Sequence, residues 1–393
     1  MELLYIIPGF IVVLTIVVFF HELGHFSVAR LFGVKIDTFS IGFGKEIFGW
    51  NDRSGTRWKV SWIPLGGYVK FWGDENAASL PDREALERMK AKAGDDYRKN
   101  FHFKPVWQRA LIVAAGPIAN FILAIVIFAV FFSVFGETLI RPRVAGVTPG
   151  SVAEAAGFQQ DDIIRKAGGE RIHSFTDLRR VVLLGVDLDM EFVVERDGKL
   201  VSLKATPERI ERKDALGNSF EGGRLGIAPP GYRNPETGEE YPQREGDLIT
   251  VRYAPHMAVL EGMERTKKII TTTFDYVGGM FAGRLDTDQL GGPLRIAQAS
   301  GQAAQQGPLF LINFIALVSV SIGLINLMPI PVLDGGHLVY YGYEAAAGRP
   351  MSVRMQEFGF RIGLVAVLGL MIFATWNDLS NFGVFEAMRQ FFQ

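Results

Sequence analysis

The chain has 393 residues, of which 48% are hydrophobic and 31 are phenylalanine. Its formal net charge of −1 gives no general attraction to nucleic acid. The sequence has no cysteine, which excludes disulfides and thiolate metal sites, so any metal ion must be bound by His, Asp or Glu. The mean hydropathy is positive, and the apolar residues are gathered in a few long runs that indicate membrane-spanning helices.

The first element is an apolar run at residues 3–20, close to the roughly 20 residues that a helix needs to cross a bilayer. It could be read as a signal peptide. However, Glu2 stands where a basic residue is usual, and no small-residue cleavage site follows. We therefore predict a transmembrane helix at the start of the chain.

His21, Glu22 and His25 follow this run directly and form the pattern H-E-x-x-H. Residues i and i+4 of a helix lie on one face, so both imidazoles can reach one ion, and Glu22 can take a proton from a water molecule on that ion. Each ionisable residue at membrane depth costs about 2.5–3.5 kcal/mol on insertion scales, and a bound cation would offset this cost. The alternative is a cluster at the headgroup boundary that merely faces water.

Residues 34–72 alternate in a strand-like manner and are punctuated by Gly and Pro. They predict short β hairpins, rich in exposed aromatic residues, that contact or enter the membrane where protein covers their backbone. An ordinary surface hairpin is the alternative. The charged segment that follows predicts a solvated helix at residues 82–92.

A second apolar run at residues 110–135 predicts the second transmembrane helix. After it, residues 141–230 predict a small mixed α+β domain with a strand at 143–147, a helix at 176–184 and a hairpin turn at Asp-Gly. A further helix is predicted at residues 258–280.

The third apolar run, residues 309–333, ends in Asp334. A catalytic zinc ion takes three protein ligands and keeps one position open, so two histidines need a third partner. Asp334 is the best candidate, His337 is a rival, and an exposed helix-end acid without a metal role is the remaining alternative.

Three further residues near the end of this run are candidates for substrate binding. Pro329 and Pro331 interrupt the helix and free backbone groups that could bind an extended peptide. Asn326 could hold the substrate backbone or a developing oxyanion, or it could bond a neighbouring helix.

A shorter fourth run covers residues 362–376, and its continuation could lie flat on the membrane surface. Basic residues are frequent in the connections before the second run and after the third run. With four spans these connections share one side, which should be cytoplasmic. Both termini and residues 136–307 would then lie outside.

Together these motifs resemble the site-2 protease family of intramembrane zinc metalloproteases, and within it the bacterial branch of sigma-E regulators. The two most specific stretches read H-E-L-G-H and N-x-x-P-x-P-x-L-D-G. The matching stretches lie at residues 21–25, 40–44, 63–70, 114–120, 291–297 and 326–335. They are distributed over nearly the whole chain.

The resemblance implies zinc ligands at His21, His25 and Asp334, a catalytic Glu22, and cleavage within transmembrane helices. It implies substrates such as pre-clipped membrane-bound anti-sigma factors and signal peptide remnants. The expected location is the bacterial inner membrane, with the active site toward the cytoplasm. The rival hypothesis is a membrane-anchored PDZ adaptor with a structural metal site; a transporter is a weaker one, because no inverted repeat is found.

The predicted fold is therefore membrane α-helical, with four transmembrane helices, a membrane-associated β-hairpin element and a periplasmic PDZ-like α+β domain. The sequence contains one recognisable PDZ-like domain, whereas the best-known relatives carry two in tandem. It would control substrate access, by its bulk or by binding a peptide C-terminus on backbone N–H groups near residues 142–144; a passive spacer is the alternative. The predicted segments are 1–30, 31–73, 74–106, 107–136, 137–230, 231–308, 309–342, 343–361 and 362–393.

Overall fold

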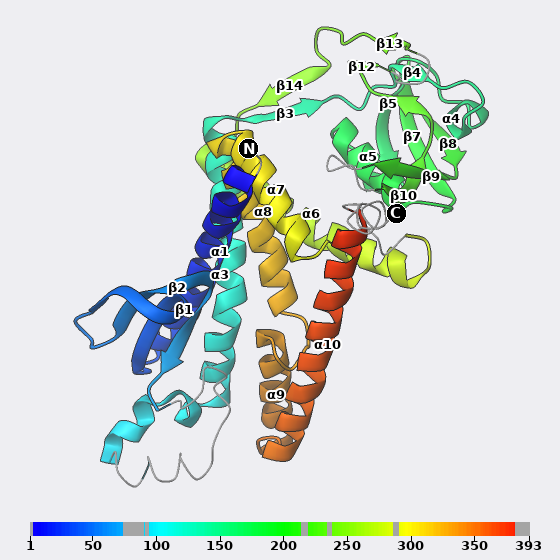
Figure 1. Cartoon of the computed structure of the whole chain (residues 1–393). Coiled ribbons are helices and arrows are strands. Elements are labelled where there is room, and N and C mark those ends of the chain that lie inside the picture. Colours follow the sequence, from blue (N-terminus) through cyan, green and yellow to red (C-terminus); the bar gives the residue numbers. More distant parts are fainter. Residues whose placement is uncertain are drawn as a thin grey trace, which may run out of the picture. The chain divides into compact units, whose positions relative to one another are not determined.

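The computed structural model (Figure 1) describes residues 3–73, 90, 94–213, 219–233, 238–285 and 291–381. Most of the predicted helix at 82–92 and the end of the last predicted segment lie outside these ranges. The chain divides into two compact units. The first comprises Met1–Phe128, Gly262–Ile270 and Gly291–Asp378, and the second comprises Ala129–Glu261, Thr271–Leu290 and Leu379–Gln393.

The first unit is mainly helical, and among the described residues four helices that lie wholly or mostly in it are long and apolar enough to cross a membrane. These candidate spans are Leu4–Leu31, Val106–Val134, Pro308–Asn326 and Val353–Ser380. The helices that carry them are α1 (Leu3–Leu31), α3 (Val106–Val134), α8 (Pro308–Asn326) and α10 (Val353–Asn381). The four predicted spans agree with these helices in number and order. The fourth begins earlier than predicted, because a few charged residues in its first turns do not interrupt the backbone hydrogen bonds.

The third predicted segment, residues 309–342, contains two helices. As the interruption predicted at Pro329 and Pro331 requires, α8 ends at Asn326 and a separate helix, α9 (Asp334–Ala347), begins at Asp334. Pro329 and Pro331 lie in the turn between them, where the missing N–H groups and the fixed φ of proline end the helix. The sequence also did not predict α7 (Pro293–Gln305), which precedes α8.

Small residues let α1 approach its neighbours closely. A Cβ on Gly24 would lie 2.2 Å from the carbonyl oxygen of Ala115 in α3, and a Cβ on Gly9 would lie 2.8 Å from the carbonyl oxygen of Ser300 in α7. Contacts of this kind are typical of helix packing in membranes, where dispersion rather than the hydrophobic effect holds helices together.

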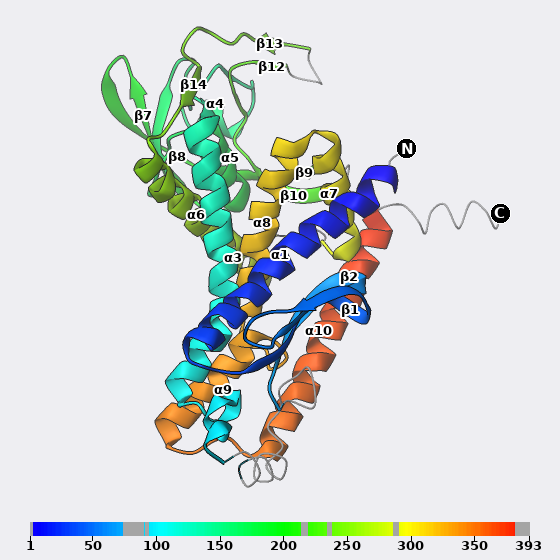
Figure 2. The same cartoon turned by 90° about the vertical axis from the view of Figure 1, so that its left-hand side faces the viewer.

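Two long strands, β1 (Ile36–Asn51) and β2 (Arg57–Phe71), form one antiparallel ribbon that lies against α1 in both views (Figures 1 and 2). The ribbon folds over, so that residues 38–41 pair with both 57–60 and 67–70. Phe39 is fully buried and stacks on Trp58, 4.3 Å between ring centroids. Other positions of the two strands expose large apolar side chains, namely Phe43, Ile47, Phe48, Trp50, Trp62 and Ile63.

The second unit contains a four-stranded antiparallel sheet with two helices. The strand order is β6-β5-β7-β8, and the turn between β7 and β8 is formed by Asp197 and Gly198, both with positive φ, as the predicted hairpin requires. The core of this unit contains Phe158, Ile164 and Phe192. The sheet and its helices are β5 (Ile163–Ala167), β6 (Glu170–Arg171), β7 (Met190–Arg196), β8 (Lys199–Ala205), α4 (Val152–Ala155) and α5 (Phe175–Leu184).

Short strand pairs complete the second unit. One of them, β3 with β14, joins the two ends of the segment that contains the sheet, and Ile140 pairs directly with Leu248. The pairs are β3 (Glu137–Ile140) with β14 (Leu248–Val251), β4 (Gly146–Val147) with β11 (Ile227–Ala228), β9 (Glu208–Lys213) with β10 (Ser219–Arg224), and β12 (Tyr232–Arg233) with β13 (Glu240–Tyr241). The described residues also form α6 (Pro255–Phe281), which contributes to both units, and two 3-10 turns of the first unit, Gly94–Lys99 and Phe101–Phe103.

The predicted strand at 143–147 is shorter in the structure, since β4 covers only Gly146–Val147, while Arg143 forms an isolated bridge with Ile163 and a buried ion pair. Its guanidinium donates to both carboxylate oxygens of Asp247, at 2.8 and 2.5 Å, and holds the pKa of that buried carboxyl below its ordinary value. The N–H of Arg143 donates to the carbonyl of Arg141, and the N–H of Val144 donates to that of Asp162. Both N–H groups therefore already have acceptors within the chain, and their binding of a peptide carboxylate stays a prediction.

Candidate metal centre

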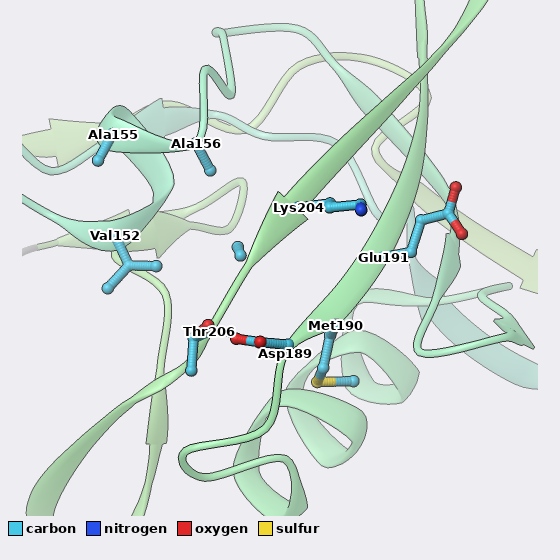
Figure 3. Close-up of a pocket in the computed structure, with 9 residues that line it drawn as sticks. Val152, Ala155, Ala156, Asp189, Met190, Glu191, Lys204 and Thr206 are labelled. Atoms are coloured by element: carbon cyan, nitrogen blue, oxygen red, sulfur yellow. Dashed lines mark hydrogen bonds between the residues drawn. The ribbon is translucent and has the colours of Figure 1, made fainter.

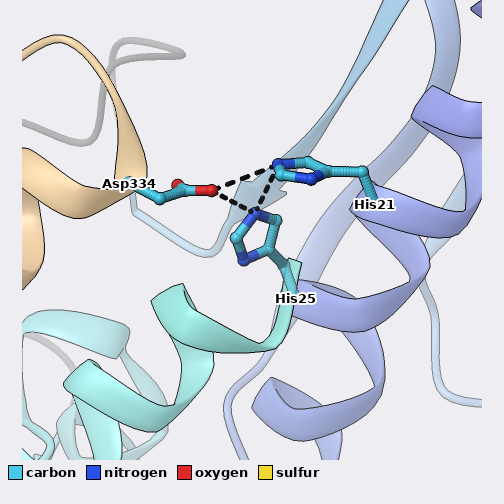
Figure 4. A group of neighbouring side chains, drawn as sticks. All are labelled: His21, His25 and Asp334. Carbon is cyan, nitrogen blue, oxygen red and sulfur yellow. Dashed lines mark hydrogen bonds and ion pairs between the residues drawn. The ribbon is translucent and has the colours of Figure 1, made fainter. Parts of the chain in front are cut away.

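His21, His25 and Asp334 come together in the first unit and form a three-ligand group (Figure 4). The Nε2 atoms of the two histidines are 3.2 Å apart, and the Oδ2 atom of Asp334 lies 3.2 Å from one and 3.4 Å from the other. The three side chains are only 12–18% exposed. Two imidazole nitrogens and a carboxylate oxygen thus point at one place from two different helices.

The chemistry of this group fits a zinc ion. Oδ2 of Asp334 is buried and, among the described residues, accepts no hydrogen bond of suitable geometry, although two ring nitrogens are within 3.4 Å. A buried acceptor without a donor is costly, and a cation at this point would offset that cost. Three nitrogen and oxygen ligands with a fourth position left open are typical of catalytic zinc sites.

The side chain of His25 is fixed by α3. Its Nδ1 donates to the carbonyl oxygen of Ile112, at 2.9 Å, which leaves the lone pair of Nε2 directed at the three-ligand group. One helical turn further along α3, Gly116 provides the space for the ring, because a Cβ there would lie 2.3 Å from Nε2. The H-E-x-x-H helix therefore depends on a second helix for the orientation of its ligand.

Asp334 owes its position to the break between α8 and α9. It is the first residue of α9, and the next two residues are buried glycines. A Cβ on Gly335 would lie 2.3 Å from the carbonyl oxygen of Leu327, and one on Gly336 would lie 2.3 Å from that of Ile330. The first turn of α9 can rest against the preceding turn only because these side chains are missing.

Glu22 lies beside the three-ligand group and faces β2. The N–H of Val69 donates to its carboxylate, and the carboxylate is close enough to interact electrostatically with all three ligands. A Cβ on Gly67 would lie 3.3 Å from Cγ of Glu22. A potential base is thus held next to the candidate metal site by the backbone of a strand.

The other predicted site residues lie near this group but are not part of it. His337 is on α9 and packs its ring edge-on against Tyr340, and within the described part of the chain it is not a member of the three-ligand group. Asn326 ends α8, and Pro329 and Pro331 occupy the turn that leads to Asp334.

Two polar contacts around the site were missed in the sequence. Asn120, in the middle of α3, is fully buried with its amide 3.2 Å from Nδ1 of His21. Arg109 of α3 donates to Glu344 of α9 at 2.6 Å and also lies over the ring of Tyr341. A buried amide or guanidinium in a membrane segment is itself a signal of function, but its partner cannot be read from the sequence.

A separate cavity of about 660 Å³ lies in the second unit, between α4 and the ends of β7 and β8 (Figure 3). Its lining includes Asp189, Glu191 and Lys204, and Thr206 donates to Asp189 at 2.5 Å. It contains none of the predicted site residues and no group of three potential metal ligands.

Comparisons with known proteins agree with the chemistry of the site. The sequence profile described as Peptidase family M50 matches residues 9–370. A protein of Rhizobium meliloti (strain 1021), named as a zinc metalloprotease, is 47% identical over 379 residues, covering 96% of this chain and 97% of its own length. A similarly named protein of Agrobacterium fabrum (strain C58) is 47% identical over 377 residues, with 96% of each chain covered. Metalloprotease MmpA of Caulobacter vibrioides is 43% identical over 394 residues, with 95% of each chain covered.

Proposed function

The chain belongs to peptidase family M50 and is a zinc metalloprotease of membranes, and from this premise we propose that it cleaves peptide bonds inside the transmembrane segments of other proteins. The observation that carries the proposal is the location of the site. His21 and His25 lie within the candidate span Leu4–Leu31, and Asp334 follows shortly after the span Pro308–Asn326. Membership in a peptidase family also argues against the non-enzymatic adaptor.

His21, His25 and Asp334 are the proposed zinc ligands, and Glu22 is the proposed base. Zinc, when bound, supplies Lewis acidity that lowers the pKa of water to about 7. Glu22 takes the proton of the attacking water and can later return it to the leaving amine. The hydrogen bond from the Val69 N–H keeps the Glu22 carboxylate directed toward β2 and beside the ligands.

The substrate would bind as an extended strand, because a helical peptide hides the bond that must be attacked. Residues 67–70 of β2 pair with β1 on one side, and Val69 faces Glu22 with its N–H. A substrate strand added next to this segment would lie beside the base. Pro329 and Pro331 leave backbone groups in the turn before Asp334 free of helical hydrogen bonds, and the Asn326 amide would contact the substrate carbonyl.

We infer the orientation from the charge of the loops and propose the substrate class from the resemblance to the site-2 protease family. The active site would lie toward the cytoplasmic side of a bacterial inner membrane, with the second unit, as a PDZ-like domain, in the periplasm. The exposed apolar side chains of β1 and β2 would contact lipid. Substrates would include pre-clipped anti-sigma factors and signal peptide remnants. Since the N–H groups at residues 143 and 144 are already engaged, we favour control of access by bulk over capture of a C-terminus.

The test is cleavage of a purified transmembrane peptide by the wild-type protein and by Glu22→Gln, with zinc content measured in both. We expect the variant to retain zinc and to lose activity by about 10²–10⁴-fold, as removal of a general base does. Glu264→Gln, on the exposed surface of α6, is the matched control and should cleave normally.

The position of the cut separates intramembrane cleavage from ordinary proteolysis. Mass spectrometry of the products should find the cut inside the apolar segment of the peptide. Cuts confined to the polar flanks would contradict the proposal, as would normal cleavage by Glu22→Gln.

A further inference from the structure

One face of α3 lies behind both proposed histidine ligands. Ile112, Gly116 and Asn120 are spaced by four residues and therefore lie along the same side of the helix. The carbonyl of Ile112 accepts a hydrogen bond from His25, and Gly116 leaves space for the His25 ring. The side-chain amide of Asn120 lies next to His21. The side chain of Asn120 is fully buried.

A neutral imidazole carries one proton, on one of its two nitrogens. Nε2 of His21 faces the three-ligand group, so it can bind a metal only when the proton is on Nδ1. That Nδ1–H then needs an acceptor. For His25 the acceptor is the backbone carbonyl of Ile112, which cannot act as a donor.

For His21 the group beside Nδ1 is the Asn120 amide, which can present either an oxygen or an N–H. In the structure Nδ2 is the atom 3.2 Å from Nδ1, while Oδ1 of Asn120 is buried without a hydrogen-bond partner among the described residues. With Nδ2 as donor, the proton of His21 must be on Nε2, where it blocks a metal. Rotation of the amide by 180° exchanges its two ends, places Oδ1 on Nδ1 and gives the orphaned oxygen a partner.

We propose that Asn120 is a positioning residue for the metal centre, whose side-chain oxygen accepts a hydrogen bond from Nδ1 of His21 and thereby keeps the Nε2 lone pair free for zinc. This rests on the proposed role of His21 as a ligand. The two ends of the amide are assigned from the hydrogen bonds they make, and a zinc-binding His21 requires the oxygen end at Nδ1.

The experiment measures the zinc dissociation constant of the full-length protein in detergent by competition with a chromophoric chelator. Asn120→Leu has a similar volume and no acceptor, and should weaken zinc binding by about 10–100-fold, as loss of such an outer partner does. Asn120→Asp retains an acceptor and loses the donor, and should bind zinc within a few-fold of the wild type. The visible spectrum of the Co²⁺-loaded protein should change in Asn120→Leu and be restored in Asn120→Asp.

Two further variants complete the design. Ser319→Ala removes a buried hydrogen bond to the backbone carbonyl of the same Asn120 but leaves the amide in place, so zinc affinity should stay within a few-fold of wild type. His21→Ala should lose zinc; if it does not, the ligand assignment itself is wrong. If His21→Ala loses zinc but Asn120→Leu binds it normally, or if Asn120→Asp is as weak as Asn120→Leu, the inference about Asn120 is overturned.

Discussion

Glycine at position 116 is explained by a single neighbour, the imidazole of His25. The space that a Cβ would fill is taken by the ring, with Nε2 at 2.3 Å and Cε1 at 2.5 Å. His25 can occupy its position as a proposed ligand only because the backbone of α3 lies close to α1 here. The residues next to Gly116 in the sequence do not predict this close approach.

We predict that Gly116→Ala weakens zinc binding and proteolysis, because the added methyl group must displace the His25 ring. Overpacking of this kind costs about 1–3 kcal/mol, which corresponds to roughly 5–150-fold if it falls on the metal-binding state. The measurement is zinc affinity together with cleavage rate. Gly369→Ala is the control, since its Cβ would have no neighbour within 4 Å and alanine favours the helix. Equal zinc affinity in the two variants would count against this account of Gly116.

An ion pair that is largely shielded from water joins α3 to α9, beside apolar contacts of Leu338 and Tyr341 with the same part of α3. Arg109 and Glu344 are 2.6 Å apart, with side chains only 13% and 16% exposed. Since α9 begins at Asp334, this contact fixes the helix that carries the third proposed ligand.

Removing one partner of this pair should affect both stability and metal binding. We expect Glu344→Ala to lower the free energy of unfolding by up to about 3–5 kcal/mol, because an unpaired guanidinium remains buried. Glu195→Ala breaks the exposed Arg165–Glu195 pair and should cost no more than about 1 kcal/mol. Denaturant unfolding and zinc titration of the two variants provide the comparison. A Glu344→Ala protein as stable as Glu195→Ala would show that the pair is dispensable.

A second ion pair, between Arg143 and Asp247, gives the second unit a dependence on acid. The pKa of Asp247 is lower in the folded protein than its ordinary value of 3.8. The stabilisation is therefore complete above pH 4 and is lost as the pH falls through the lower folded pKa.

Hydrogen exchange of the amides in β5 and β14, corrected for the intrinsic effect of pH, measures this dependence. The wild type should keep its protection at pH 7 and lose it progressively below pH 4. Asp247→Asn should have reduced protection already at pH 7 and a flatter pH profile. A variant with the wild-type profile would exclude Asp247 as the responsible group.

How far the sequence predicts these elements depends on the range of the interactions. The spans and the H-E-x-x-H face are set by hydrophobicity and helical period, so local reasoning finds them. The break before Asp334 was visible in Pro329 and Pro331, but the start of a new helix there depends on Gly335 and Gly336 packing on the turn. Partners such as Asn120 for His21 lie 99 residues apart and appear only when α1 and α3 pack.

At the scale of the whole molecule, the proposed role of the domain between β3 and β14 is control of access. Ile140 and Leu248 are paired neighbours, so residues 141–247 can be replaced by an Asn-Gly turn that closes the same two strands as a hairpin. This deletion removes the domain without altering the strands that flank it.

We predict that the shortened protein still cleaves trimmed substrates but no longer discriminates against substrates with a bulky outer domain. The ratio of trimmed to full-length cleavage should fall toward one, since the proposed filter is gone while the three ligands and Glu22 remain. Replacing the Asp197-Gly198 turn by Asn-Gly leaves the domain intact and is the control. Retained activity with an unchanged ratio would mean that the domain is a passive spacer.

The β3–β14 pair also bears on the free energy of loop closure. In a flexible chain, bringing together the ends of an inserted segment becomes more costly only with the logarithm of its length, about 0.6 kcal/mol for each doubling. Strands whose last residues already pair can therefore accept a second domain of equal size at a cost smaller than that of one average destabilising mutation. The number of domains inserted between such strands can then change during evolution with little consequence for the folding of the helices.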